Sequence, residues 1–138
     1  MDSKYKNVTI QVGPDSGGKL PPQVLDLEES VLGAIMLDKM AIDVVNEIII
    51  PESFYKDAHI LIYRAMVSLY TKREPIDLLT VTQELREQGT IDLAGGAYYV
   101  SKLTMRLTSA ANVEFHARII QEKYIQRELI KISNLTIQ

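Results

Sequence analysis

The sequence contains no cysteine, and this absence excludes three classes of protein at once. Disulfide scaffolds, zinc ribbons and enzymes with a thiol nucleophile all need cysteine side chains. Only two histidines are present, His59 and His116, which leaves few ligands for a transition-metal site. Each histidine lies beside an apolar helical face, and we expect both to be structural or half-exposed side chains.

Long hydrophobic runs are missing as well. No apolar run reaches the roughly 18 to 20 residues that a helix needs to cross a bilayer, so we expect no membrane-spanning segment. The first residues, from Met1 to Lys4, do not begin the apolar stretch of a signal peptide. The expected location is therefore the cytoplasm.

The composition is that of an ordinary globular protein of 138 residues, 46% hydrophobic and 24% charged, which fits one domain with a modest core. The formal net charge of -3 conceals an asymmetry. Residues 21–100 contain six basic and thirteen acidic side chains, whereas residues 101–138 contain six basic and three acidic ones. An acidic body argues against nonspecific DNA binding and permits docking to a complementary protein surface.

Residues 1–22 contain half of the glycines and prolines of the chain, so we predict a disordered tail there. Within it, residues 13–20 match the phosphate-binding pattern G-x-x-x-x-G-K-[ST] except at the last position. Leu20 offers no hydroxyl for Mg²⁺, and the two prolines that follow prevent a regular helix from starting at Lys19. A nucleotide site is therefore not expected.

From Gln23 onward the hydrophobic periodicity is helical almost throughout, and no region alternates in the manner of a strand. We predict an all-α fold, a compact orthogonal bundle of about six helices with a long helix at its C-terminal end. The expected helices cover residues 23–37, 38–47, 58–73, 80–89, a segment after the Gly95-Gly96 turn, and 109–138. Asp38 and Ser109 are expected to cap two of them, and Thr80 with Gln83 forms a capping box for the fourth.

Gly33 lies in the middle of the first expected helix. A glycine there costs about 1 kcal/mol relative to alanine, so it is expected to permit the close approach of another backbone.

The last expected helix is apolar on several sides. One face consists of Val113, Ala117, Ile120 and Tyr124. Further apolar stripes contain Ile125, Leu129 and Ile132, and Ile119, Ile130 and Ile137. A helix with several apolar sides is covered by more than one neighbour, so we expect this one to pack on something outside the chain.

Lys123, Arg127 and Lys131 recur every four residues and form a basic stripe on the same helix. Strong DNA binders make six to ten phosphate contacts, roughly, and Glu122 and Glu128 interrupt this stripe. We favour a solvated or subunit-facing edge, and keep a helical nucleic-acid-binding module as the alternative.

Three acidic side chains, Asp26, Glu28 and Glu29, occupy the first turns of the first expected helix. Their attraction to the positive end of the helix dipole is sufficient to explain them. A functional alternative is an acidic docking patch.

Five short segments occur in a specific order. Residues 22–33 read PQVLDLEESVLG, and the next pieces are Phe54-Tyr55, Pro75-Ile76-Asp77-Leu78, Gly95-Gly96 with Tyr99, and Ser109-Ala110-Ala111-Asn112. In this order and spacing they resemble the N-terminal domain of replicative DNA helicases of the DnaB family, whose opening pattern is roughly P-x-x-[aliphatic]-E-A-E-x-S-V-L-G. The resemblance covers about residues 20–138. Asp26 and Leu27 depart from the usual Glu-Ala.

The resemblance implies a non-catalytic domain, since the ATPase of the family, which uses ATP and Mg, is absent from this sequence. In the family this domain is a helical head followed by a helical hairpin, of which the long helix here is one arm. The hairpins pair subunits, as dimers and as a trimer of dimers, into a collar on the hexamer. The collar docks the C-terminal domain of primase and, in some species, a loader, which implies a cytoplasmic bacterial replisome.

The resulting division of the chain is a tail over 1–22, a helical head over 23–108, and the start of the pairing element over 109–138. The expected self-association residues are Ile125, Leu129, Ile130 and Ile132. The candidates for primase docking are Asp26, Glu29 and Tyr99. Expected structural residues are Gly33, Gly95, Gly96 and Asn112. No catalytic residue, cofactor or metal is expected in this chain, and contact with DNA is expected to be weak or absent.

Overall fold

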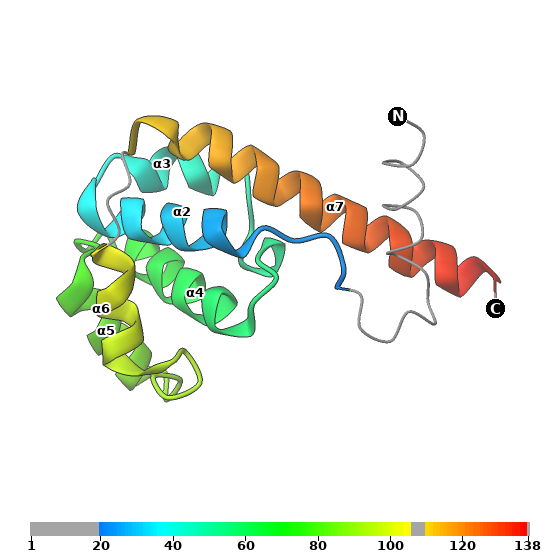
Figure 1. Ribbon diagram of the computed structural model, residues 1–138. Coiled ribbons are helices and arrows are strands. Elements are labelled where there is room, and N and C mark those ends of the chain that lie inside the picture. Colours follow the sequence, from blue (N-terminus) through cyan, green and yellow to red (C-terminus); the bar gives the residue numbers. More distant parts are fainter. Residues whose placement is uncertain (1–19, 106–109, 138) are drawn as a thin grey trace.

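A computed structural model describes residues 20–105 and 110–137 of the chain, and this part is helical with no strand (Figure 1). The expected all-α class and its long final helix are therefore confirmed. The helices are α2 (Leu25–Leu37), α3 (Ala41–Asn46), α4 (Asp57–Thr71), α5 (Leu78–Glu87), α6 (Gly96–Thr104) and α7 (Val113–Ile137). Two short 3₁₀ turns, η2 (Pro51–Ser53) and η3 (Ala110–Asn112), precede α4 and α7.

Helix α2 is the centre of the head. It packs against α7 on one side and against α4 and α6 on others, and residues 30–36 of α2 are buried. Because α2 is covered on several sides, its apolar residues surround the helix instead of forming one narrow stripe.

At Gly33 the helices α2 and α6 approach each other closely. A Cβ atom at this position would collide with the backbone carbonyl of Leu103 in α6. The close approach of another backbone that the sequence suggested at Gly33 is therefore present in the structure.

The start of α5 differs from the expectation. Asp77, not Thr80, is the N-cap: its Oδ1 accepts the Thr80 N–H at 2.9 Å, and the Thr80 hydroxyl oxygen accepts the Asp77 N–H at 2.8 Å. The predicted box of Thr80 with Gln83 is wrong, because the aspartate three residues earlier is the better acceptor and Gln83 instead donates to Glu87. The predicted stop is correct, since Gly89 follows the helix with a φ of 73°.

The second expected helix is shorter than predicted. Asp38 does not cap it: its carboxylate accepts the Met40 N–H at 2.9 Å within a turn, and α3 begins at Ala41. Side-chain hydrogen bonds of aspartate to nearby backbone compete with helix formation, which explains the delayed start. The expected cap at Ser109 lies outside the described residues.

A buried carboxylate joins α4 to α5. Glu84 accepts hydrogen bonds from the Ser68 hydroxyl at 2.6 Å, from the Lys72 ammonium at 3.1 Å and from the Gln88 amide at 3.1 Å. The Ser68 hydrogen bond, supported by Lys72, holds the pKa of Glu84 below its usual value despite burial. This pair of helices is therefore held by polar contacts as well as by apolar packing.

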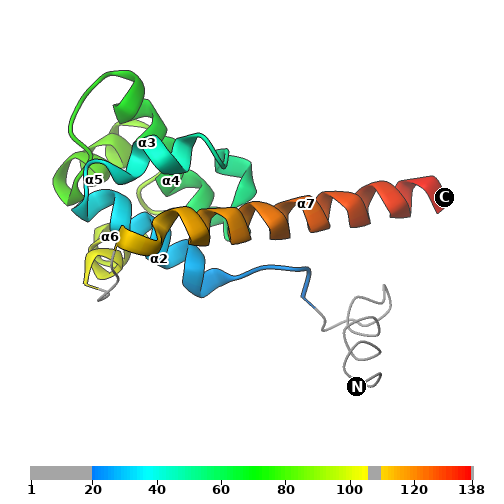
Figure 2. The same cartoon turned by 90° about the horizontal axis from the view of Figure 1, so that it is seen from above.

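Helix α7 begins on the head and then projects away from it (Figures 1 and 2). Its first half covers α2 and α3 with Val113, Ala117 and Ile120, which are buried. Residues 131–135 are all exposed, since the helix has left the head there. In the described part of the chain, no helix is both long enough and apolar enough to span a membrane.

Candidate self-association and docking surfaces

The outer face of α7 exposes large apolar side chains. Ile125, Leu129 and Ile132 are 48%, 59% and 57% exposed and follow one another with helical spacing. Ile130, also an expected self-association residue but in a separate stripe of the sequence, is half-buried in a hollow with Tyr55 and Tyr124. We call Ile125, Leu129 and Ile132 the α7 stripe.

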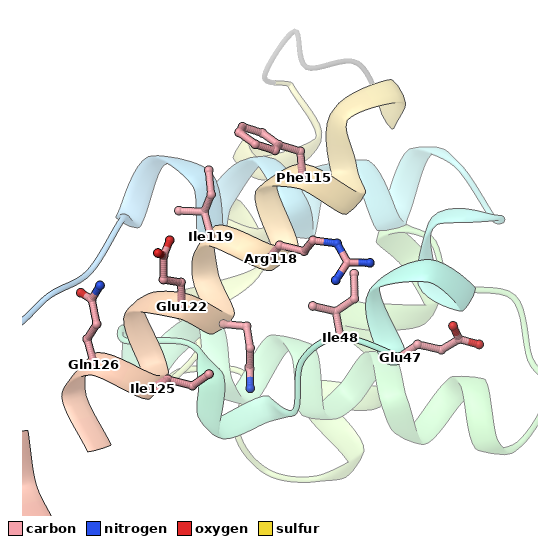
Figure 3. Close-up of a pocket in the computed structure, with 9 residues that line it drawn as sticks. Glu47, Ile48, Phe115, Arg118, Ile119, Glu122, Ile125 and Gln126 are labelled. Carbon is pink, nitrogen blue, oxygen red and sulfur yellow. The ribbon is translucent and has the colours of Figure 1, made fainter. Parts of the chain in front are cut away.

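An open groove continues the α7 stripe onto the head (Figure 3). Its apolar lining residues are Ile48, just after α3, and Phe115, Ile119 and Ile125 on α7. The polar side chains that also line it are Glu47, Arg118, Gln121, Glu122 and Gln126. The groove has a volume of about 690 Å³, and Phe115 at its end is 65% exposed. Ile125 belongs to both, so the groove and the α7 stripe are adjacent, and the exposed apolar side chains that they share are of the kind that marks an interaction site.

The basic stripe of α7 is engaged within the molecule. The Arg127 guanidinium donates to the carbonyl oxygens of Pro22 and Ser53, each at 2.9 Å, and the Lys131 ammonium donates to Glu128 at 3.1 Å. Burial lowers the pKa of Arg127, the nearby Glu28 carboxylate partly opposing this shift. Two of the three basic side chains of this stripe are thus bound to protein groups, which disfavours the nucleic-acid alternative.

A polar network lies inside the head. The Glu28 carboxylate and the His59 ring are 1% and 0% exposed, and Nδ1–H of His59 donates to Glu28 Oε1 at 2.7 Å. The other ring nitrogen, Nε2, lies 2.7 Å from the hydroxyl oxygen of Tyr99. Glu28 also accepts the backbone N–H groups of Tyr55 at 2.7 Å and Lys56 at 3.4 Å. We call Glu28, His59 and Tyr99 the buried network.

The network serves as a remote cap for α4. The N-cap of this helix, Lys56, makes no side-chain capping bond, and the Glu28 carboxylate from α2 binds the N–H groups just before the helix instead. A carboxylate at a helix N-terminus is also favoured by the helix dipole. The contact therefore fixes the start of α4 against α2.

Tyr99 brings the buried network to the surface. Its hydroxyl donates to Glu29 Oε2 at 3.2 Å and accepts from the Lys56 ammonium at 3.3 Å, and this ammonium also lies 4.5 Å from the centre of the Tyr99 ring. Two of the three candidate docking residues, Glu29 and Tyr99, are thereby in contact. Asp26 is exposed in the first turn of α2, the helix that contains Glu29.

The close approach of α2 and α6 at Gly33 explains the contact between Glu29 and Tyr99. Glu29 lies one helical turn before Gly33 on α2, and Tyr99 lies one turn before Leu103 on α6, so each pair shares a face. Contact between Gly33 and Leu103 therefore brings Glu29 and Tyr99 together. Gly95, with a φ of 99°, lies against the Tyr99 side chain, where a Cβ would be 2.9 Å from it. Asn112 is exposed in η3.

Sequence reasoning missed Glu28 and His59 as partners. The sequence favours the helix dipole for Glu28, with an acidic docking patch as the alternative, whereas the structure shows a buried acceptor. A usable signal was present: Glu28 precedes the buried Val31 and Leu32 by three and four residues, so it occupies a core position. An acidic side chain at a core position requires a buried donor, and His59 is in the same relation to the buried Ile62.

Residues 20–105 and 110–137 contain no cluster of three or more side chains suited to a metal ion. The phosphate-loop-like match at residues 13–20 lies almost wholly outside the described part of the chain, as does the predicted tail.

A family model decides the assignment: the model of the DnaB-like helicase N-terminal domain matches residues 20–122. The chain belongs to this family. The DnaB N-terminal domain is the non-catalytic part of a replicative helicase, and the resemblance noted in the sequence is confirmed. Over 120 residues the chain is 48% identical to the replicative DNA helicase DnaB of Rhodothermus marinus and 42% identical to that of Geobacillus stearothermophilus.

These relatives are much longer than the DnaB N-terminal domain described here. The match covers 87% of this chain but only 13% and 26% of the two helicases. Among solved structures, the N-terminal domain of DnaB helicase from Mycobacterium tuberculosis is similar with a TM-score of 0.82 and 39% identity, covering 86% of each chain. A DnaB-like replicative helicase, studied with its interactions with primase, is similar with a TM-score of 0.70 and 26% identity over 80% of this chain and 26% of that one.

Proposed function

We propose that this domain pairs helicase subunits through α7 and so builds the N-terminal collar of a hexameric replicative helicase. The observation behind the proposal is the exposed apolar surface of the α7 stripe, which lies next to the partly apolar groove that Ile48 and Phe115 line. A monomer would leave this surface in water, at a cost of about 25 cal/mol for each square ångström. ATP and Mg are then expected to act in a motor domain of the complete helicase.

Association should depend on concentration and on the α7 stripe. Replacing Leu129 by glutamate places a charge in the apolar contact, and we expect the dissociation constant of the self-complex to rise by at least about tenfold. Sedimentation velocity or light scattering over a range of concentrations measures this constant. Leu79→Glu is the matched control, because Leu79 is an exposed leucine on α5, away from α7, and should leave association unchanged.

Two results would overturn the pairing proposal. One is a parent chain that stays monomeric at every concentration, and the other is equal weakening by Leu79→Glu and Leu129→Glu.

We further propose that the surface around Glu29 and Tyr99 docks the C-terminal domain of primase. The contact of these two side chains, with Asp26 exposed one turn earlier, supports an acidic surface with an aromatic at its edge. The acidic balance of residues 21–100 suits a basic partner surface. The similar DnaB-like replicative helicase interacts with primase, which supports this class of partner. A loader is the further partner that the family resemblance implies.

Calorimetric titration with the primase C-terminal domain tests the docking surface. We expect Asp26→Ala combined with Glu29→Ala to weaken binding by about tenfold, with a stronger effect at low salt. Glu87→Ala on α5 is the control, since Glu87 is an exposed acidic residue elsewhere on the head. If the folded double variant binds primase with unchanged affinity, primase docks on another face of the domain. Sedimentation of the same variant measures subunit pairing separately.

A further inference from the structure

Arg127 lies near the place where α7 leaves the head, and its side chain joins three segments that are distant in sequence. Its Nη1 donates to the carbonyl oxygen of Pro22, just before α2, and its Nη2 donates to that of Ser53 at the end of η2. The guanidinium also lies 5.4 Å from the ring centre of Tyr55 and 5.8 Å from that of Tyr124. The side chain is therefore held by two carbonyls and flanked by two aromatic rings.

The groups that Arg127 holds are themselves fixed. Ser53 is fully buried; its hydroxyl donates to Gln121 Oε1 at 2.8 Å and accepts the Ile50 N–H at 3.0 Å. Tyr55 is held through its N–H by the buried Glu28 carboxylate at 2.7 Å. Arg127 thus connects α7 to a rigid part of the head and to the segment that leads into α2.

The packing of α7 on the head weakens along the helix. Val113, Ala117 and Ile120 are buried, residues 121–130 are half-buried or exposed, and residues 131–135 are all exposed. A helix that projects without support takes its direction from the last contacts that it makes with the head. In Figure 1 the segment before α2 runs beside α7 in this region.

We propose that Arg127 is a positioning residue that fixes the direction in which the second half of α7 leaves the head. Arginine suits this role because its planar fork donates in two directions at once, which the point charge of a lysine does not do. In this role Arg127 connects the head to α7 through backbone carbonyls and does not serve to bind phosphate. Its consequence for the geometry of the collar rests on the proposed pairing, but the direction of the helix is a property of the single chain.

Distance measurement between two spin labels tests whether Arg127 fixes the direction of α7. The sequence has no cysteine, so Arg86→Cys on α5 and Asn134→Cys on α7, both at exposed positions, place one label on the head and one on the projecting half. Dilution of the labelled chain with unlabelled chain removes distances between subunits. We expect a single narrow distribution of label-to-label distances in the parent and a broad one in Arg127→Met. In Arg127→Lys the distribution should become partly narrow again.

Lys131→Met is the matched control. It removes a cation of the same stripe one turn later, whose partner Glu128 lies on the same helix, so the distribution should stay as in the parent. Circular dichroism and thermal unfolding of each variant separate a redirected helix from an unfolded head, and if Arg127→Met does not fold, Arg127→Lys decides. The proposal is overturned if Arg127→Met or Arg127→Lys folds and shows the same distance distribution as the parent. Sedimentation of the same samples reports on pairing independently.

Discussion

Replacing Glu28 by alanine is expected to lower the free energy of unfolding by about 3–5 kcal/mol, as the loss of one partner from a buried pair does. The substitution removes the acceptor of His59 Nδ1–H and of the Tyr55 N–H, both at 2.7 Å, and leaves these donors buried. Urea unfolding followed by circular dichroism measures the loss.

Asp26→Ala is the matched control for the helix dipole. Asp26 is an acidic residue in the same first turn, but it is exposed, so its loss should cost about 1 kcal/mol or less. Equal costs for Asp26→Ala and Glu28→Ala would mean that the dipole, and not the buried network, accounts for Glu28. If Glu28→Ala does not fold, Glu28→Gln, which keeps an acceptor oxygen and loses the charge, should give an intermediate loss.

Gly33→Ala is expected to destabilise the head by about 1–3 kcal/mol, as overpacking does. At an unconstrained position in a helix the same substitution stabilises by about 0.5–1 kcal/mol, so the prediction is one of sign as well as size. The added methyl group would collide with the Leu103 carbonyl, which belongs to the backbone of α6 and moves only with that helix. Chemical unfolding gives the change in stability.

A second readout links Gly33 to the surface. If α6 shifts away from α2, the contact between Glu29 and Tyr99 is lost with it, and the proposed affinity for primase should fall too. Gly89→Asn is the control, because Gly89 has open space around it and asparagine tolerates its positive φ. A Gly33→Ala variant that is more stable than the parent would contradict the close approach of the two helices.

Helix positions were predictable where local sequence decides them. The apolar periodicity of residues 58–69 agrees with α4, and Gly89 ends α5 as predicted. Errors occurred at starts of helices, where several side chains compete for the same N–H groups. Asp77 preceded the predicted cap of α5, and the Asp38 side chain bound a turn instead of starting α3. Such competition depends on geometry over three or four residues, which periodicity does not resolve.

The candidate surfaces were predictable in part. The apolar side chains Ile125, Leu129 and Ile132 were identified from helical spacing, because a helix that is apolar on several sides needs more than one neighbour. Helical spacing places Ile130 in a separate stripe, but spacing does not show which stripe the head covers, and Ile130 is half-buried. Arg127 was assigned to a basic stripe by its spacing, whereas its partners Pro22 and Ser53 are 105 and 74 residues away.

The sequence by itself determined that the chain is all-α, that it has no cysteine chemistry, and that its segments follow the order of the DnaB N-terminal domain. These properties depend on composition and on local periodicity, which need no knowledge of distant contacts. Only the tertiary structure decided that Glu28 is an internal acceptor, that Glu29 meets Tyr99, and that Arg127 binds backbone carbonyls. Each of these contacts joins segments at least 27 residues apart, and their donors and acceptors meet only once the helices have packed.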